Sequence, residues 1–402
     1  MSDALENLNG MPVGPLGLIV LPGCEDLAAK VNDYLTTWRK HRADQANGNG
    51  GYFDQDLKES YIIETQFTRF ATGEAKATIN QSVRGYDIFI LCDMFNHGIN
   101  YVMQEKEVPM SPDDHYANLK RAISAIGGKA KRITVIMPML YEGRQHRRQG
   151  RESLDCANAL QELCLYLNVE NIITFDAHDA RVQNAIPLHS FENVQPVYQM
   201  IKALANNVDD LHFNKEHMMI ISPDEGGMSR GIYYSTVLGL ELGMFYKQRD
   251  YSRIIDGRNP VIAHEFLGDN VKDKDVIVVD DMISSGGSML EVGKKLKDLG
   301  AKRIFTCVGF GLFCNGLKKF DAAYEEGIIT RVFSTNLIYR TPELLSREWF
   351  VDVDLSKYVS YILDTLNHDS SVSKLLNPVD RIERFLKKCN YRSNCDCMTT
   401  KN

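Results

Sequence analysis

The sequence lacks any apolar run long enough to cross a membrane. No stretch reaches the ~18–20 residues that a bilayer span requires, and the opening MSDALENLNG has neither the basic start nor the apolar core of a signal peptide. An excess of basic residues is also absent, since 46 Lys and Arg stand against 53 Asp and Glu, a formal net charge of −7. Non-specific nucleic-acid binding needs a basic face. These absences predict a protein with neither a membrane nor a nucleic-acid partner.

Paired metal-binding cysteines and the common nucleotide loop are also missing. The chain has nine cysteines, and the three near its end, Cys389, Cys395 and Cys397, have no CxxC spacing and no neighbouring histidine. They therefore do not predict a zinc site. Several others lie in apolar patterns, where cysteine behaves as a small hydrophobe, and this usage predicts a reducing, cytoplasmic compartment. No GxxxxGKS or GxxxxGKT string occurs, so any ATP site must use another geometry.

What the sequence does contain is a regular alternation of short apolar runs and longer amphipathic stretches. This alternation is typical of βαβ units and a parallel sheet, so the predicted fold class is α/β. The strands are apolar without alternating, as expected for a sheet covered on both faces. They are predicted at residues 17–21, 87–92, 132–138, 171–177, 217–222, 275–281 and 303–310. Helices are predicted at 25–38, 112–126 (with Ser111 as N-cap), 153–167, 196–206 and from Ser288 to Gly300.

The length predicts two domains. At ~100–200 residues per domain, 402 residues correspond to two α/β halves. We place the first at residues 14–190 and the second at 191–365, followed by an extension, 366–402, in which the periodicity is lost. Residues 41–60 are polar and rich in Gly and Asn, and we interpret them as a surface insertion.

The most informative stretch is VIVVDDMISSGGSML, residues 276–290. A strand leads to Asp280 and Asp281, and a short loop then turns into a helix. We call residues 284–288 the phosphate loop, and they are Ser284, Ser285, Gly286, Gly287 and Ser288. Backbone N–H groups at a helix start bind a phosphate dianion, and glycine lets the backbone approach it closely. The aspartates can accept hydrogen bonds from sugar hydroxyls or hold a divalent ion. A phosphorylated sugar satisfies both demands, and the alternative is a glycine turn with surface acids.

VVDDMISSGGS resembles the phosphoribosyl-binding loop of type I phosphoribosyltransferases and ribose-phosphate diphosphokinases (PRPP synthetases). Five further segments resemble the second group, and the similarity extends from about residue 17 to about residue 365. They are TRFATGE with INQSVRG (68–74 and 79–85), RQHRR (144–148), FDAH (175–178) and SPDEGG (222–227). The resemblance implies two similar phosphoribosyltransferase-like domains, each a mostly parallel sheet flanked by helices.

The resemblance also implies which residues bind ligands. The ATP-binding residues would be Phe70, Glu74, Arg144 and Gln145, and the ribose 5-phosphate-binding residues Asp224, Asp280, Asp281 and the phosphate loop. Phe70 offers a flat face for adenine, and guanidinium forks match phosphate oxygens. Without the resemblance, simple packing explains Phe70 and Glu74 better than adenine binding does, and a solvated basic stretch explains the arginines equally well. His178 follows a strand at the edge where α/β sheets place ligands, and the resemblance makes His178 and Asp224 contacts of Mg²⁺.

In the resembled family, a Lys-x-Arg pair begins a mobile loop that closes over the phosphates. Lys247 and Arg249 match that pair, and with His178 they form the implied catalytic set. The sequence departs from the family pattern at three positions where Asp is usual: Thr72, His146 and Ser284. We assign His146 no role.

The implied reaction converts ATP and ribose 5-phosphate into AMP and PRPP with Mg²⁺, in a homo-oligomer. Two alternatives stay open. A phosphoribosyltransferase would share the phosphate loop but would not need the N-terminal half. A non-catalytic regulatory homologue that binds true synthetase subunits is favoured by Ser284 and Thr72, and disfavoured by the retained His178, Lys247 and Arg249.

Overall fold

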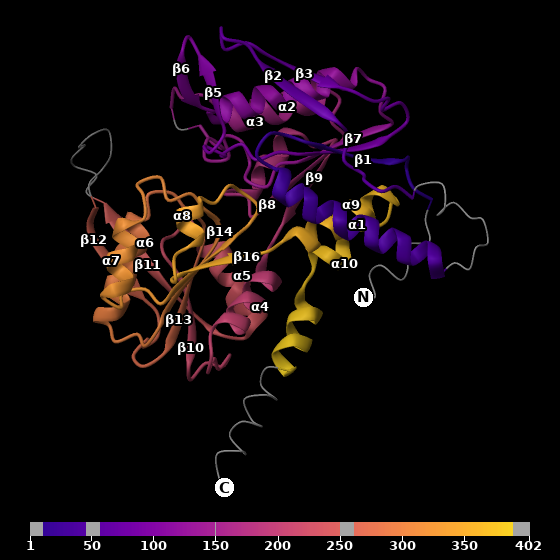
Figure 1. Cartoon of the computed structure of the whole chain (residues 1–402). Helices are drawn as coiled ribbons and strands as arrows, with labels where there is room; N and C mark the ends of the chain where they lie inside the picture. Colours follow the sequence, from indigo (N-terminus) through magenta and orange to yellow (C-terminus); the bar gives the residue numbers. More distant parts are fainter. Residues whose placement is uncertain (1–10, 46–56, 149, 250–260, 389–402) are drawn as a thin grey trace. The chain divides into compact units, whose positions relative to one another are not determined.

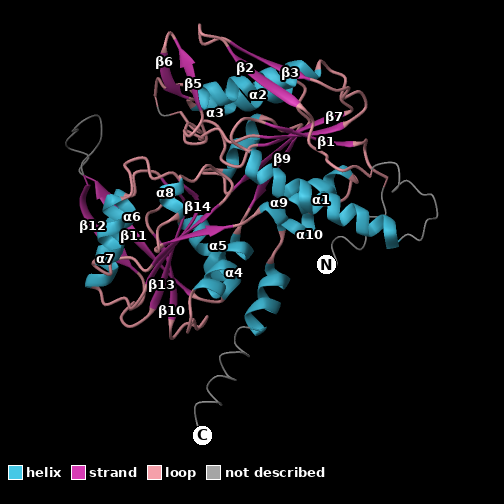
Figure 2. Cartoon of the chain, in the orientation of Figure 1, coloured by secondary structure: helices cyan, strands magenta, loops and turns pink. Residues whose placement is uncertain are grey.

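The computed structural model describes residues 11–45, 57–148, 150–249 and 261–388. The chain divides into two compact units, and each is built around its own main sheet (Figure 1). The first unit extends to Gln195 and also includes Asn336–Tyr339 and Asp354–Asn377. The second contains Pro196–Thr335, Arg340–Val353 and the chain from Pro378 onward. In Figure 2 the strands of each unit gather with helices beside them, as an α/β fold requires.

The first unit is built on a five-stranded sheet in the order β1-β4-β7-β8-β9, and every neighbouring pair is parallel. The strands are β1 (Leu16–Val20), β4 (Asp87–Leu91), β7 (Arg132–Ile136), β8 (Asn171–Phe175) and β9 (Ser190–Val194). The helices are α1 (Glu25–Gln45), α2 (Pro112–Ile126), α3 (Asp155–Gln161) with the π-helical turn Glu162–Tyr166, the 3-10 turn Ala180–Ala185, α9 (Ser356–Asn367) and α10 (Ser373–Leu376). Two hairpins complete it, β2 (Thr65–Arg69) with β3 (Ala75–Ile79), and β5 (Asn100–Met103) with β6 (Lys106–Pro109).

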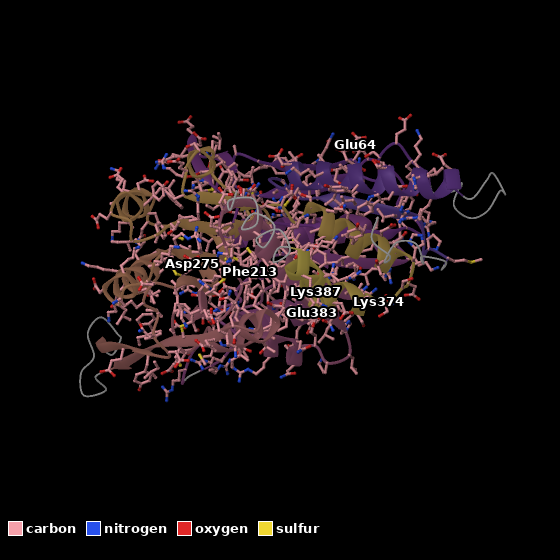
Figure 3. The ribbon with its side chains drawn as sticks, turned by 90° about the horizontal axis from the view of Figure 1, so that it is seen from below. Glu64, Phe213, Asp275, Lys374, Glu383 and Lys387 are labelled. Atoms are coloured by element: carbon pink, nitrogen blue, oxygen red, sulfur yellow. The ribbon has the colours of Figure 1, made fainter. Side chains whose placement is uncertain are left out.

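The second unit has a seven-stranded sheet in the order β12-β11-β10-β13-β14-β15-β16, and among these described strands only the β11–β12 pair is antiparallel. Its strands are β10 (Met218–Ser222), β11 (Glu241–Arg249), β12 (Val261–Leu267), β13 (Asp275–Ile283), β14 (Ile304–Gly311), β15 (Arg331–Thr335) and β16 (Phe350–Val353). Its helices are α4 (Val197–Asn207), α5 (Met228–Leu238), α6 (Gly287–Asp298), α7 (Lys318–Glu325) and α8 (Pro342–Leu345). Asp275, labelled in Figure 3, begins β13 and pairs with Arg303 at 2.6 Å. The predicted α/β class and mostly parallel sheets are confirmed.

Local sequence signals predicted two helix ends correctly. The Ser111 hydroxyl accepts a hydrogen bond from the N–H of Asp114 at 3.2 Å, and the Asp114 carboxylate accepts one from the N–H of Ser111 at 3.0 Å. This capping box satisfies donors that a helix start would otherwise leave unpaired. At the end of α6, Gly300 adopts φ +89°, a left-handed conformation that glycine reaches without a Cβ penalty.

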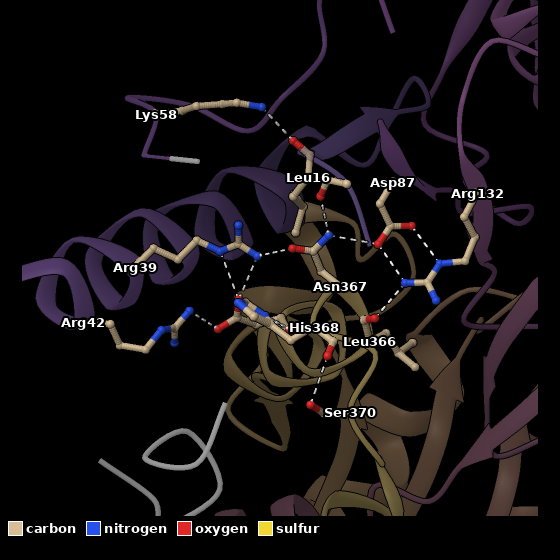
Figure 4. Close-up of polar contacts among 12 residues, drawn as sticks. Leu16, Arg39, Arg42, Lys58, Asp87, Arg132, Leu366, Asn367, His368 and Ser370 are labelled. Carbon is tan, nitrogen blue, oxygen red and sulfur yellow. Dashed lines mark hydrogen bonds and ion pairs between the residues drawn. The ribbon is translucent and has the colours of Figure 1, made fainter. Parts of the chain in front are cut away.

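We predicted that residues 191–365 form the second domain. In the structure α9, which lies at the end of that range, belongs to the first unit instead. Trp38 of α1 stacks on Tyr361 of α9 with ring centroids 4.4 Å apart. Arg39 of α1, labelled in Figure 4, pairs with Asp364 of α9 at 2.9 Å. The Asp364 side chain is fully buried. Contacts between segments some 325 residues apart in the chain therefore return α9 to the first unit.

Two further predictions need correction. The predicted insertion 41–60 begins too early, since α1 continues through Gln45, while residues 46–56 lie outside the described part of the chain. The predicted aperiodic extension 366–402 contains α10, and residues 379–388 are also helical. Across the described ranges, none of the helices is long and apolar enough to cross a bilayer.

Candidate functional site

The predicted adenine-binding residues lie on the turn of the β2–β3 hairpin. Phe70 is 44% exposed, so its ring face is available to a ligand. Backbone hydrogen bonds close the turn, from the N–H of Phe70 to Glu74 O and from the N–H of Gly73 to Phe70 O, both 2.8 Å. Gly73 has φ +93°, which suits glycine. The Thr72 hydroxyl donates to the Glu74 carboxylate at 3.1 Å, so this departure from the family pattern orients Glu74.

Arg69 holds this turn in place, a role that the sequence did not reveal. Its guanidinium donates to Gly73 O at 2.9 Å and to Asp114 at 3.2 Å, and lies over the Tyr101 ring, 4.3 Å from the centroid. Burial acts to raise the pKa of Asp114, but hydrogen bonds from Ser111 and the Arg69 charge outweigh it and lower the pKa. Asp114 is therefore a carboxylate that caps α2 and anchors Arg69 at once.

The RQHRR and FDAH segments meet beyond the carboxyl ends of the neighbouring strands β7 and β8. After Phe175 the chain turns at Asp176, which has φ +42°, and His178 is exposed. The His146 and His178 rings contact edge to face with centroids 5.4 Å apart, and His146 Nε2 lies 3.4 Å from Asp179 Oδ2. His146, to which we assigned no role from the sequence, contacts the FDAH segment and the residue after it.

The pKa values at this edge follow from those contacts. Burial lowers the pKa of His146, with Asp179 acting in the opposite direction. Hydrogen bonds from Arg181 lower the pKa of Asp179 to about 2. Arg144 and Gln145 are exposed on the loop beside them. The edge therefore combines exposed cations with one firmly ionised carboxylate, a setting for an anion that also carries a metal ion.

In the second unit, Asp224 follows β10, and Asp280 lies within the neighbouring strand β13 near its carboxyl end. Asp224 lies in the loop after β10, where its Oδ1 accepts from the N–H of Gly227 at 3.2 Å and its carbonyl accepts from the Ser222 hydroxyl at 2.8 Å. Arg230, in the first turn of α5, approaches Asp280 Oδ1 at 3.7 Å. Burial and the neighbouring Asp281 charge raise the pKa of Asp280, and Arg230 opposes them. Arg230 is a second residue that the sequence did not single out.

The two adjacent aspartates are not equivalent. Strand β13 runs to Ile283, two residues beyond its predicted end, so both carboxylates lie within the strand. Successive side chains on a strand point to opposite faces, and accordingly Asp280 is half-buried whereas Asp281 is 4% exposed. Asp280 is the more accessible carboxylate for a ligand.

The phosphate loop has the geometry that its glycines predict. Gly286 adopts φ +80°, and a Cβ there would collide with the Phe320 ring. Helix α6 begins at the next residue, Gly287, so the loop leads directly into a helix N-terminus. Ser285, Gly287 and Ser288 are exposed, and Ser284 is half-buried. Exposed backbone at a helix start is the arrangement that binds phosphate.

The predicted catalytic pair lies at the end of β11. The backbone of Lys247 and Arg249 continues that strand, paired with β12 through Lys247–His264 and Arg249–Val261. Their side chains lie outside what the structure describes. Their catalytic role stays a prediction.

A magnesium ion is compatible with these residues only if the substrate supplies part of its shell. Within the described ranges, no three His, Cys, Asp or Glu side chains gather as a metal site. Mg²⁺ is commonly held by one or two carboxylates together with waters and substrate phosphates, so it does not need such a cluster. His178 in the first unit and Asp224 in the second are each a predicted donor of this kind, and their role stays a prediction.

A separate pocket of about 920 Å³ lies between α2 and α3 in the first unit, and the predicted site residues are not among those that line it. Tyr116 and Tyr141 stack within it with parallel rings 4.3 Å apart, and Tyr116 donates to Glu162 at 2.9 Å. These three side chains therefore interact with one another within the pocket.

Comparison with known proteins gives the family. Residues 16–165 match the N-terminal domain of ribose phosphate pyrophosphokinase, and residues 188–336 match the phosphoribosyl transferase domain. The ribose-phosphate pyrophosphokinase of Vibrio cholerae is 25% identical over 315 residues, which cover 77% of this chain and 90% of that protein. The Mycoplasma pneumoniae ribose-phosphate pyrophosphokinase is 29% identical over 312 residues, covering 76% of this chain and 85% of that protein.

The fold has a solved counterpart. The crystal structure of phosphoribosylpyrophosphate synthetase from Mycobacterium smegmatis is similar with a TM-score of 0.67 and 20% identity, covering 88% of this chain and 99% of that one. At this identity the similarity concerns the fold. The two domain matches together span most of the chain, with the N-terminal match before the phosphoribosyl transferase match. The chain therefore belongs to the ribose-phosphate pyrophosphokinase family.

Proposed function

We propose that this chain transfers the β,γ-diphosphoryl group of ATP to the C1 hydroxyl of ribose 5-phosphate, forming PRPP and AMP. The observation that carries the proposal is the phosphate loop. It follows β13, the strand that contains Asp280 and Asp281, and leads into α6. The same chain also contains, N-terminal to this loop, a region that matches the N-terminal domain of ribose phosphate pyrophosphokinase. A phosphoribosyltransferase would not need that N-terminal domain.

The second unit would bind ribose 5-phosphate. Backbone N–H groups of the phosphate loop receive the 5-phosphate, with Ser284, Ser285 and Ser288 supplying hydroxyls. Asp280 accepts hydrogen bonds from the ribose hydroxyls, and the backbone N–H of Asp281 donates to the Asp280 carboxylate at 2.9 Å. Asp224, at the carboxyl end of the adjacent strand, binds the sugar or a magnesium-linked water.

The first unit would bind ATP. Phe70 stacks on adenine, and Glu74, oriented by Thr72, accepts from the exocyclic amine. Arg144 and Gln145 contact the phosphates of ATP. They lie on the same loop as His146, whose ring contacts that of His178. Arg69 positions the adenine turn without touching the ligand.

Catalysis would rest on positioning and charge neutralisation, because phosphoryl and diphosphoryl transfer leave little covalent work to the protein. Lys247 and Arg249 cover the charge that develops on the transferred group, and His178 holds the phosphate side. His178 and Asp224 are the residues of this chain that would serve as its donors to Mg²⁺, and the ion would neutralise phosphate charge. We also propose that the chain works in the cytoplasm as a homo-oligomer, as the family resemblance implies.

The non-catalytic regulatory homologue is the second candidate, favoured by Ser284 and Thr72 in place of Asp. A direct test separates the two. Purified chain is incubated with ATP, ribose 5-phosphate and Mg²⁺, and AMP is quantified beside calorimetric binding of each substrate. Turnover to AMP supports the enzyme. Binding of ribose 5-phosphate without AMP, restored to turnover by Ser284→Asp, would establish the regulatory homologue.

A further inference from the structure

A second loop lies against the phosphate loop and donates hydrogen bonds to the carbonyls of Ile283 and Ser284. We call residues 312–314, which follow β14, the brace. The N–H groups of Leu312 and Phe313 donate to Ile283 O at 2.9 and 3.3 Å. The N–H of Cys314 donates to Ser284 O at 2.9 Å. The brace therefore engages the last carbonyl of β13 and the first carbonyl of the phosphate loop.

These bonds determine where the neighbouring N–H groups point. In a trans peptide the C=O and N–H of one peptide unit point in opposite directions, and none of the peptide bonds in the described ranges is cis. The carbonyl of Ser284 shares its peptide with the N–H of Ser285, and the carbonyl of Ile283 shares its peptide with the N–H of Ser284. Since both carbonyls point at the brace, both N–H groups point away from it. The brace therefore keeps the carbonyl oxygens of these two peptides away from an incoming anion. It leaves the N–H groups of Ser284 and Ser285 pointing outward as hydrogen-bond donors.

Phe313 maintains the shape of the brace. Its backbone has φ +47°, a conformation that is costly for a bulky residue and persists only where surrounding structure holds it. Its ring is 7% exposed and contacts Phe320 edge to face at 5.0 Å and Trp349 at 5.6 Å between centroids. The N–H of Gly316 donates back to Phe313 O at 2.8 Å. Ring burial and this hydrogen bond together hold the left-handed backbone.

The same aromatic cluster also touches the phosphate loop directly. Phe320, 1% exposed, occupies the space that a side chain at Gly286 would need. Trp349 stacks on Phe320 at 5.4 Å, and its indole N–H donates to Asp321 at 2.8 Å, which fixes the ring. The cluster supports the loop through packing at Gly286 and through the brace at Ile283 and Ser284.

We propose that Phe313 is a positioning residue for ribose 5-phosphate: through the brace it orients the Ser284 and Ser285 N–H groups toward the 5-phosphate. This inference rests on the proposed function, because it takes the phosphate loop as the sugar-phosphate site. Phe313 does not touch the substrate. Its effect is on ribose 5-phosphate and not on ATP.

The test compares Phe313→Ala with Phe313→Leu and with Phe305→Ala. Phe305 is a fully buried phenylalanine at the opposite end of β14, so it controls for the loss of a core ring. Calorimetry measures ribose 5-phosphate and ATP separately on each variant. We expect Phe313→Ala to weaken ribose 5-phosphate binding by about ten-fold or more, the equivalent of ~1.4 kcal/mol, with ATP binding within two-fold of wild type. Phe313→Leu should recover most of the affinity, and Phe305→Ala should alter neither ligand's binding by more than two-fold.

Hydrogen exchange on the same proteins measures how firmly the backbone of the brace and of the phosphate loop is held when no ligand is bound. Peptides covering 283–288 and 312–316 should exchange faster in Phe313→Ala and at wild-type rates in Phe305→Ala. Wild-type exchange in both peptides would overturn the inference, as would equal losses of ribose 5-phosphate and ATP. If Phe313→Ala does not fold, Phe313→Leu bears the test, with a smaller loss confined to ribose 5-phosphate. A wild-type chain that binds no ribose 5-phosphate would refute the proposed function, and the exchange rates would still decide the brace.

Discussion

Replacing Asp364 by asparagine perturbs the buried ion pairs between α1 and α9 (Figure 4). Asp364 Oδ1 lies 2.9 Å from Arg39 Nη2, and Oδ2 lies 2.7 Å from Arg42 Nη2. The Asp364 side chain is fully buried, and the two arginine side chains are 6% and 13% exposed. Asparagine keeps the shape of the side chain and removes the charge, so two guanidinium groups lose their shared counterion.

The expected cost follows from that geometry. Removing one partner of a buried pair leaves an uncompensated buried charge and costs ~3–5 kcal/mol of unfolding free energy. Burial acts to raise the pKa of Asp364, but the Arg39 and Arg42 charges outweigh it, and the folded-state pKa is lowered. The stabilisation is therefore present above the unfolded pKa of ~3.9 and is lost as the pH falls toward the folded pKa. The difference between wild type and Asp364→Asn should shrink below about pH 4.

Tryptophan fluorescence suits the assay because the chain has two tryptophans, one in each unit. Trp38 stacks on Tyr361 in the α1–α9 contact, so in a Trp349→Phe background it reports this contact during urea unfolding. Asp369→Asn is the matched control: Asp369 lies 3.6 Å from Arg132 but is 80% exposed, and exposed pairs contribute ~0–1 kcal/mol. An Asp364→Asn protein whose unfolding free energy lies within that same range of the wild type would refute the reasoning.

The remaining predictions concern the ligands. Lys247→Ala should lower kcat by roughly 10²–10³-fold with smaller changes in KM, and steady-state kinetics with near-normal kcat would remove Lys247 from the mechanism. Asp280→Ala together with Asp281→Ala should weaken ribose 5-phosphate binding by about ten- to a hundred-fold while ATP binding stays nearly intact; calorimetry with equal losses would contradict the assignment. In the active enzyme, Ser284→Asp should change turnover by less than about ten-fold, since one hydrogen-bond acceptor replaces another; a larger change in kcat would show that this side chain decides activity.

The central strands and the phosphate loop could be predicted because their signals are local. A run such as VIVVDD followed by Ser and Gly specifies a buried strand, a tight turn and a helix start within a short stretch of sequence. The hairpin strands β2 and β3 could not be recognised in the same way. Their residues alternate between half-buried and exposed, with no apolar run to mark a core.

The contacts that shape the site depend on distant parts of the chain. The α1–α9 pairing joins residues far apart in sequence, so periodicity alone placed α9 in the wrong half. His146 meets Asp179 only because β7 and β8 are neighbours in the sheet. Phe313 carries no sequence signal for its left-handed backbone, since aromatic residues rarely adopt it. Such residues become visible only when the fold brings the loops together.

The central claim is that a diphosphoryl group leaves ATP as a unit and reaches the sugar. Supplying the chain with Mg²⁺, ribose 5-phosphate and ATP labelled with ³²P at the β-phosphorus tests this directly. The label should appear in the sugar product, with unlabelled AMP formed in equal amount. Label retained in ADP, or AMP release that does not depend on ribose 5-phosphate, would contradict the assignment.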